Sequence, residues 1–262
     1  MQIDISGKVA LITGAGRGIG EGLARRFAQE RARVVLLDRD EAAVAGLSAE
    51  LAALGVEVLA LTADVSRESD VERATAAVVE RFGAVDILVN NAGIAPEAAV
   101  AEMTAPDWDE TFAINTRGVF LCTRAVIPHM KKARAGRILS ASSFAAVIPS
   151  VGFAAYSASK AAVVSFTRVL AAELGPWGIT ANCYTPGMVP TPLNHYAEAT
   201  PATRDRLLNT LSLRRWGSPD DIASLLIFLA SDHASYITGA DLEISGGKYA
   251  VQFPHLAYER AK

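Results

Sequence analysis

Residues 9–20 of the chain read VALITGAGRGIG, an apolar run that leads into a glycine-rich turn. An unbroken apolar run that ends at a turn is typical of a strand buried on both faces. The glycines let the backbone turn sharply, and the helix expected over Gly20–Glu30 would present free N–H groups and a partial positive charge. The glycines do not fit G-x-G-x-x-G, since the sixth position from Gly14 is Ile19, but they fit T-G-x-x-x-G-x-G. The stretch therefore predicts a phosphate-binding loop between a strand and a helix, with a plain tight turn as the alternative.

The same alternation of apolar runs and helical patterns continues through the chain. The strands expected from it cover residues 9–12, 34–37, 56–61, 87–89, 137–142, 180–184 and 241–244. The helices expected between them cover residues 20–30, 41–54, 69–82, 108–130, 156–174 and 219–230. Uniformly apolar strands separated by helices indicate a parallel sheet covered on both faces. We therefore expect an α/β fold, a doubly wound three-layer sandwich with a central parallel sheet of about seven strands.

The length of 262 residues suits one large domain or two small ones. No linker rich in Pro, Ser or Gly divides the chain, so we expect one dinucleotide-binding and catalytic domain over residues 1–262. Residues 187–213 break the rhythm with prolines, which predicts a mobile insertion over a site. Residues 248–262 form a tail rich in aromatic side chains, which favour packing on a neighbouring subunit and shaping of a substrate pocket over a frayed terminus.

Composition excludes several classes of protein. Half of the residues are apolar (51%), which excludes disorder as the main state, and the net charge is −3 with no basic tract typical of nucleic-acid binding. No apolar run is long enough to span a membrane, and the start has no secretory pattern. Cys122 and Cys183 lie too far apart for a disulfide framework, which favours the cytoplasm. The four histidines lack metal spacing, so no metal is expected, although His195 in the insertion could touch substrate.

Asp38 follows the second expected strand and stands 18 residues after Gly20. An acidic side chain there can accept hydrogen bonds from the ribose hydroxyls of adenosine, and it would repel the 2′-phosphate of NADP. The alternative role, a helix N-cap, suits Asp40 better. Arg17 and Arg39 could each pair with a 2′-phosphate, but Asp38 outweighs them in our interpretation. We therefore expect NAD rather than NADP.

Tyr156 and Lys160 stand four residues apart and would share one face of the expected helix. A nearby lysine cation favours the phenolate and lowers the pKa of a tyrosine, which can then exchange a proton with an alcohol or a carbonyl. Ser143 lies just after an expected strand, where its hydroxyl could hold the substrate oxygen. Taken alone, each residue has an ordinary alternative explanation. Lys160 could be a solvated lysine on a surface helix, and Ser143 could be a turn residue.

Further motifs occur in a definite order along the chain. They are Thr13-Gly14…Gly18-Ile19-Gly20, Asp64-Val65, Asn90-Asn91-Ala92-Gly93, Asn115, Ser143, Tyr156…Lys160 and Pro186-Gly187. With these motifs, the sequence resembles the short-chain dehydrogenase/reductase family in its compact form, over about residues 5–247. The resemblance implies a Rossmann-like fold and, in relatives, tetramers built through two long helices and the C-terminal strand region.

The resemblance also implies roles for single residues. Asp64 and Val65 would hold the adenine, Asn91, Ala92 and Gly93 would line the adenosine ribose, and Ile114 would pack nearby. Asn115 would complete a tetrad with Ser143, Tyr156 and Lys160 and anchor a water that relays protons. Lys160 would also bind the nicotinamide ribose. The nicotinamide side would be contacted by Pro186, Gly187, Val189 and Thr191.

The function implied is an NAD(H)-dependent oxidoreductase that interconverts a secondary alcohol and a ketone. The favoured substrates are a sugar, a polyol or a hydroxy-acid-like molecule, with no nucleic acid or membrane as partner. One alternative is an NADPH-dependent 3-oxoacyl-thioester reductase, against which Asp38 counts. The other is a non-catalytic dinucleotide-binding sensor, against which the intact Tyr156 and Lys160 count.

Overall fold

The computed structural model describes residues 3–194 and 196–261, and within them a parallel sheet forms the centre of the molecule. Its strands are β1 (Val9–Thr13), β2 (Arg33–Asp38), β3 (Val58–Thr62), β4 (Ile87–Asn90), β5 (Gly136–Ala141), β6 (Ile179–Pro186) and β7 (Asp241–Ile244). They lie in the order β3-β2-β1-β4-β5-β6-β7, and every neighbouring pair is parallel. The predicted fold class, with a parallel sheet of about seven strands, is confirmed.

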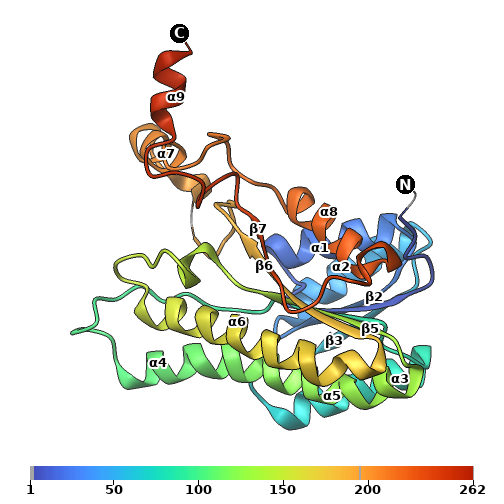
Figure 1. Ribbon diagram of the computed structural model, residues 1–262. Helices are drawn as coiled ribbons and strands as arrows, with labels where there is room; N and C mark the ends of the chain where they lie inside the picture. The colour runs from blue at the N-terminus through green and yellow to red at the C-terminus, as the bar shows by residue number, and fades with distance from the viewer. Residues whose placement is uncertain (1–2, 195, 262) are drawn as a thin grey trace.

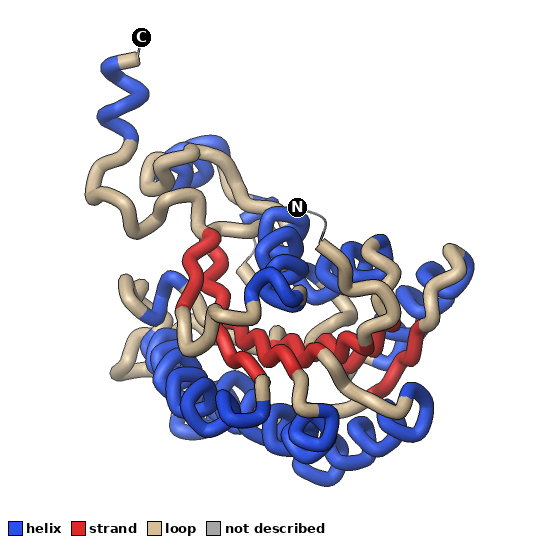
Figure 2. Tube along the Cα trace, turned by 45° about the vertical axis from the view of Figure 1, so that its right-hand side comes forward, coloured by secondary structure: helices blue, strands red, loops and turns tan. Residues whose placement is uncertain are grey.

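Helices cover both faces of this sheet. They are α1 (Gly18–Gln29), α2 (Glu41–Ala53), α3 (Glu68–Phe82), α4 (Ala105–Phe112), α5 (Gly118–Ala133), α6 (Ala154–Leu174), α7 (Pro201–Leu208), α8 (Pro219–Ala230) and α9 (His255–Arg260). Helices α1, α2 and α8 lie on one face, and α3, α5 and α6 lie on the other (Figure 1). Figure 2 shows the strands as a layer between these two layers of helices.

The strands lack polar alternation because both of their faces are buried. In β1, Ala10 and Ile12 pack in the core beneath α1 and α8, whereas Val9 and Leu11 pack in the core beneath α3 and α5. A side-chain period of two therefore sends neighbouring residues into two different cores. The long apolar runs of the sequence follow from this arrangement.

The helix expected over residues 108–130 runs without a break from α4 into α5, but it is not α-helical throughout. Between α4 and α5 the backbone forms a π-helical turn over Ala113–Arg117, and Asn115 is fully buried at its centre. Such a turn widens the helix locally and is frequent at functional sites. The side chain of Asn115 reaches out of the turn to the backbone of Ile94, just beyond β4.

The expected insertion over residues 187–213 contains helical structure of its own, a 3-10 turn at Tyr196–Glu198 and helix α7. Met188, Leu208 and Leu211 form a small apolar cluster there. The tail beyond β7 ends in α9, which projects away from the sheet (Figures 1 and 2). No helix of the described part of the chain is long and apolar enough to cross a membrane.

The strand order reverses at β1, because β2 and β3 lie on one side of it and β4 to β7 on the other. At such a switch point the loops leave the carboxyl ends of the strands in opposite directions and open a crevice. The phosphate-loop candidate follows β1 directly, so the topology places it at this crevice.

Candidate active site

A cavity of about 770 Å³ lies at the carboxyl ends of the strands. It brings together nearly all of the residues that the sequence singled out. Its walls include Gly14, Arg17, Gly18, Ile19, Asp38, Arg39, Asp64, Val65, Asn91, Ala92, Gly93, Ile114, Ser143, Tyr156, Lys160, Pro186, Gly187, Val189 and Thr191. Gly20 and Asn115, also expected at the site, are not among the lining residues.

The loop after β1 has the shape that a bound pyrophosphate requires. Gly14 has a positive φ of 65°, and a Cβ on it would stand 2.8 Å from the Cα of Ala92. Arg17 precedes α1 without a side-chain capping bond, so no side chain at that position occupies the free N–H groups of the first turn. Gly20 supports the loop from behind, because a Cβ there would stand 2.0 Å from the carbonyl oxygen of Gly14. The cradle fits the phosphates of a dinucleotide.

Asp38 ends β2 beside this loop. One carboxylate oxygen accepts the N–H of Gly16 at 2.9 Å, and the other accepts the N–H of Asp40 at 3.1 Å. Each oxygen has a further lone pair, so the carboxylate can also accept hydroxyl protons from a ligand. Arg17 and Arg39 also line the cavity.

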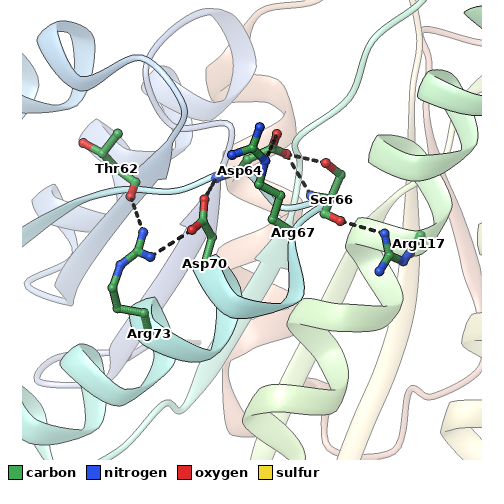
Figure 3. A network of polar contacts seen from close by, with 7 residues as sticks. All are labelled: Thr62, Asp64, Ser66, Arg67, Asp70, Arg73 and Arg117. Carbon is green, nitrogen blue, oxygen red and sulfur yellow. Dashed lines mark hydrogen bonds and ion pairs between the residues drawn. The ribbon is translucent and has the colours of Figure 1, made fainter. Parts of the chain in front are cut away.

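Asp64 belongs to a polar network at the start of α3 (Figure 3). Its Oδ1 accepts from the backbone N–H and the hydroxyl of Ser66, at 2.9 and 2.7 Å, and its Oδ2 lies 3.7 Å from Nε of Arg67. The N–H of Asp64 donates to Asp70, and Arg117, the last residue of the π-helical turn, donates to the carbonyl of Ser66. The network therefore holds Asp64 at the cavity wall, between the first turn of α3 and the π-helical turn.

Asn91 ties the end of β4 to the glycine loop. Its Nδ2 donates to the carbonyls of Thr13 and Gly14, and its Oδ1 accepts from the hydroxyl of the buried Tyr184. The hydroxyl of Thr13 accepts the N–H groups of Asn91 and Ala92 at 3.0 and 3.1 Å. Thr13 and Tyr184 were not predicted to have this role, since a sequence pattern does not show which side chains meet across strands.

Asn115 is held by a closed set of hydrogen bonds. Its Oδ1 accepts the N–H of Ile94 at 2.9 Å, and its Nδ2 donates to the carbonyl of Ile94 and to the hydroxyl of Ser159. The Ser159 hydroxyl in turn donates to the carbonyl of Tyr156 at 2.7 Å. The side chain of Asn115 thus ties the loop after β4 to the helical turn that carries Tyr156. Ser159, which sequence reasoning missed, is the link.

Tyr156, Lys160 and Ser143 meet where β5 and α6 face the cavity. Lys160 is buried (3% exposed), its Nζ donates to the carbonyl of Ala141 at 2.9 Å, and it lies 5.8 Å from the centre of the Tyr156 ring. Ser143 and Tyr156 are joined by a side-chain hydrogen bond, and the Ser143 hydroxyl also accepts the N–H of Ala145. The helical spacing of four residues correctly predicted that the phenol and the ammonium share one face.

The expectation that the pKa of Tyr156 is lowered is wrong for this structure. Burial raises the pKa of Tyr156, and the hydrogen bond from Ser143 lowers it by less. Burial also lowers the pKa of Lys160, to about 8. Both shifts have one cause, because an apolar environment disfavours the charged form of either group. Tyr156 is therefore a neutral phenol at neutral pH, the form that can donate a proton.

The far end of the cavity is lined by residues that the sequence patterns did not single out. Tyr196 stacks on Trp216, with ring centres 5.3 Å apart, and Phe144 lies under the ammonium of Lys248. Tyr196 belongs to the insertion, Phe144 to the segment after β5 and Lys248 to the start of the tail. Trp216 follows the insertion and supports Tyr196. The aromatic side chain of Tyr196 within the insertion was a sequence signal from which part of this lining could have been predicted. His195 lies outside the described residues.

Over residues 3–194 and 196–261, no cluster of three or more His, Cys, Asp or Glu side chains could hold a metal ion. Cys122 and Cys183 are buried free thiols, and burial raises the pKa of each.

Comparisons with known proteins agree with this geometry. The profile of the family described as Enoyl-(Acyl carrier protein) reductase matches residues 14–248. The hydroxy(phenyl)methylsuccinyl-CoA dehydrogenase subunit BbsD of Thauera aromatica is 41% identical over 93% of this chain and 97% of its own length. D-threitol dehydrogenase of Mycolicibacterium smegmatis is also 41% identical, over 93% of each chain.

A solved structure resembles the chain equally well. The 3-ketoacyl-(acyl-carrier-protein) reductase of Brucella melitensis, complexed with NADH, is 41% identical. It superposes with a TM-score of 0.87 over 94% of this chain and 99% of that chain. The likeness thus extends over nearly the whole chain, in sequence and in fold.

Proposed function

We propose, from the premise that this chain belongs to the short-chain dehydrogenase/reductase family, that it interconverts a secondary alcohol and a ketone with NAD(H) as cofactor. The chain is an oxidoreductase of the kind that acts on CH–OH or keto groups. The proposal of alcohol and ketone chemistry with NAD(H) rests on one observation. A single cavity is lined by the glycine loop and by Ser143, Tyr156 and Lys160.

The catalytic residues divide the proton chemistry between them. In ketone reduction, Tyr156 gives its phenolic proton to the carbonyl oxygen while Ser143 holds that oxygen beside the phenol. In alcohol oxidation, the tyrosinate takes the hydroxyl proton as the C–H bond breaks with both of its electrons and the C=O bond forms. Bound NAD(H) supplies the hydride acceptor or donor at that carbon. Positioning the two reacting carbons in contact contributes a large part of the rate.

Lys160 acts on both the tyrosine and the cofactor. One of its three N–H donors is used by the carbonyl of Ala141, which leaves two for a ribose hydroxyl or an ordered water. Asn115 is a positioning residue in this proposal, because its side chain holds the loop after β4 against the turn of α6 that carries Tyr156. A water relay anchored at Asn115 stays a prediction.

The cofactor would lie along the cavity from the glycine loop to Tyr156. We assign the adenine to Asp64 and Val65, and the nearby ribose to Asp38, with Ile114 and Asn91–Gly93 beside it. The nicotinamide side is assigned to Pro186, Gly187, Val189 and Thr191. The carboxylate of Asp38 favours NAD over NADP, because it would repel a 2′-phosphate. The NADH complex of the Brucella relative supports the same choice.

The test is a panel of alcohols and ketones, measured at the nicotinamide absorbance with NAD(H) and with NADP(H). We expect turnover with NAD(H), a kcat/KM at least tenfold lower with NADP(H), and loss of turnover in Tyr156→Phe. The fully exposed Tyr236 provides the matched control, Tyr236→Phe, which should keep wild-type rates. Cofactor binding without any turnover would favour the non-catalytic sensor.

A 3-oxoacyl-thioester reductase is the second candidate, favoured by the likeness to the 3-ketoacyl-(acyl-carrier-protein) reductase of Brucella melitensis. An acetoacetyl thioester with NADPH therefore belongs in the same panel. A preference for that pair over NADH with small ketones would replace the first proposal by the second.

Three further proposals concern the whole chain. We infer one domain, because the cofactor loop and the catalytic residues are attached to the same sheet. A homotetramer is supported by exposed apolar side chains on the two long helices, Phe120 of α5 and Val169 of α6. A cytoplasmic location is supported by the two buried free thiols.

A further inference from the structure

Two cations stand at the substrate end of the cavity, Lys248 just beyond β7 and Arg206 on α7. The ammonium of Lys248 lies 5.4 Å from the centre of the Phe144 ring, and Phe144 follows Ser143 in the chain. The adjacent Tyr249 donates its hydroxyl proton to the carbonyl of Ser143 at 3.4 Å. Lys248 is therefore placed beside the residue that would hold the reacting oxygen of the substrate.

Both cations have spare hydrogen-bonding capacity. Nζ of Lys248 donates to the hydroxyl of Thr210 at 2.7 Å, which uses one of its three donors. Neither Lys248 nor Arg206 forms an ion pair with a described residue. Burial lowers the pKa of Lys248, as expected where no carboxylate compensates its charge.

Glu97, an acidic side chain that also lines the cavity, belongs to another part of its wall. It is exposed and lies against Gly152, in the segment that leads into α6. Lys248 lies against Phe144 and Thr210 instead. A half-buried ammonium with two free donors, next to an aromatic ring and in a cavity that a second cation also lines, is suited to a substrate carboxylate.

We propose that Lys248, assisted by Arg206, binds the carboxylate of the substrate, so that the substrate is a hydroxy acid and its product the corresponding keto acid. This inference rests on the proposed alcohol and ketone chemistry and names its substrate class. Neutral sugars and polyols would leave both cations without a partner, at a cost in binding.

The test compares acids with their neutral esters. Racemic 3-hydroxybutyrate, 4-hydroxypentanoate and 5-hydroxyhexanoate are oxidised with NAD, each beside its methyl ester, with glycerol 3-phosphate as a phosphate-bearing secondary alcohol. We expect at least one acid to exceed its ester about tenfold or more in kcat/KM, since a hydrogen bond to a charged group contributes at that level.

Variants then assign the preference to residues. Lys248→Met should lower the acid-to-ester ratio of kcat/KM about tenfold or more, Arg206→Gln by a smaller factor, and Lys248→Arg should retain most of it. Two exposed residues give matched controls, Lys132→Met on α5 and Arg204→Gln on α7, and both should keep the wild-type ratio. In the wild type alone, butyrate should inhibit reduction of a neutral ketone more strongly than butyramide does.

The outcomes are distinct. Turnover of neutral alcohols with no preference for any acid, or an acid-to-ester ratio unchanged in Lys248→Met, overturns the carboxylate site and leaves the oxidoreductase proposal standing. A preference confined to glycerol 3-phosphate replaces the carboxylate by a phosphate. Absence of turnover with every alcohol, ketone and cofactor removes the proposed function itself.

Discussion

At the scale of the residue, Lys160 shows how a proposed catalytic group is kept at a cost in stability. It is a buried cation without an anionic partner among the described residues, and burial lowers its pKa from 10.5 to about 8. At neutral pH the folded protein must hold this charge in an apolar environment, at a cost of about 3 kcal/mol. The charge that the proposed chemistry needs therefore lowers the free energy of unfolding.

Replacing Lys160 by methionine should therefore stabilise the fold while it abolishes activity. The hydrogen bond to Ala141 is lost, so we expect a net gain of about 1–2 kcal/mol in unfolding free energy at pH 7, measured by urea denaturation. The unfolded lysine binds more protons than the folded one between pH 8 and 10.5, so wild-type stability from this group rises over that window. The gain of the variant should shrink there. A variant that is less stable than the wild type by the same amount at pH 8 and at pH 10.5 would contradict this account.

The pH dependence of the reaction follows from Tyr156. Burial raises its pKa, so the phenol is protonated at neutral pH and serves ketone reduction directly. Alcohol oxidation needs the tyrosinate, whose population grows about tenfold per pH unit below that pKa. Between pH 6 and 7, below the pKa of about 8 at which Lys160 loses its charge, single-turnover oxidation should rise steeply while reduction stays nearly constant. A flat oxidation profile over this range would show that another group is the base.

At the scale of the element, the packing of α1 on α8 depends on a missing side chain. A Cβ on Gly22 of α1 would stand 2.2 Å from the Cβ of Pro219, the first residue of α8. By contrast, nothing lies within 4 Å of a Cβ on Gly46, on α2. These two helical glycines should therefore respond in opposite ways to substitution by alanine.

We expect Gly22→Ala to destabilise the fold by about 1–3 kcal/mol, because the added methyl group must displace Pro219 or tilt α1. Gly46→Ala should stabilise it by about 0.5–1 kcal/mol, since alanine is the better helix former and the space is open. Urea denaturation of both variants measures the difference. If both substitutions shifted stability in the same direction, the close approach of α1 and α8 would not be the deciding factor.

At the scale of the whole molecule, the exposed apolar side chains of α5 and α6 bear on how copies of the chain assemble. Phe120 on α5 is 41% exposed and Val169 on α6 is 54% exposed, and Phe120 packs on Phe166, one turn before Val169. The two exposed side chains therefore lie on neighbouring parts of one helical face. Such a face is suited to a second copy of the chain.

A charge on this face should break the proposed tetramer. We expect Phe120→Glu combined with Val169→Glu to elute at a smaller mass in size exclusion with light scattering. Leu54→Glu is the control, because Leu54 is 74% exposed at the end of α2, away from the two long helices. A wild-type monomer, or an unchanged mass in the double variant, would overturn this interface.

The tail is the second property at this scale. Tyr258 donates to the carbonyl of Ser212, but Val251, Phe253 and Leu256 are exposed. We predict that removing residues 250–262 changes the KM for the substrate or the mass of the assembly, with little effect on NAD affinity, which titration of cofactor fluorescence measures. A truncated chain identical to the wild type in both respects would show that the tail is dispensable.

Local patterns in the sequence predicted much of this protein, because local geometry is written into short stretches. The run 9–12 implied a strand buried on both faces, and the glycines after it implied a phosphate loop, since backbone freedom and apolar period need no distant partner. The spacing of Tyr156 and Lys160 placed them on one helical face for the same reason. The bounds of α8 and β7 also followed from local pattern alone.

Only the tertiary structure decided what depends on residues far apart in the chain. The order of strands, the π-helical turn around Asn115 and the meeting of Lys248 with Phe144 all join distant segments. The pKa of Tyr156 is the sharpest case. Its neighbour Lys160 alone would lower that pKa, but burial by the surrounding elements raises it, because desolvation is the sum over everything packed around the phenol and no single neighbour determines it.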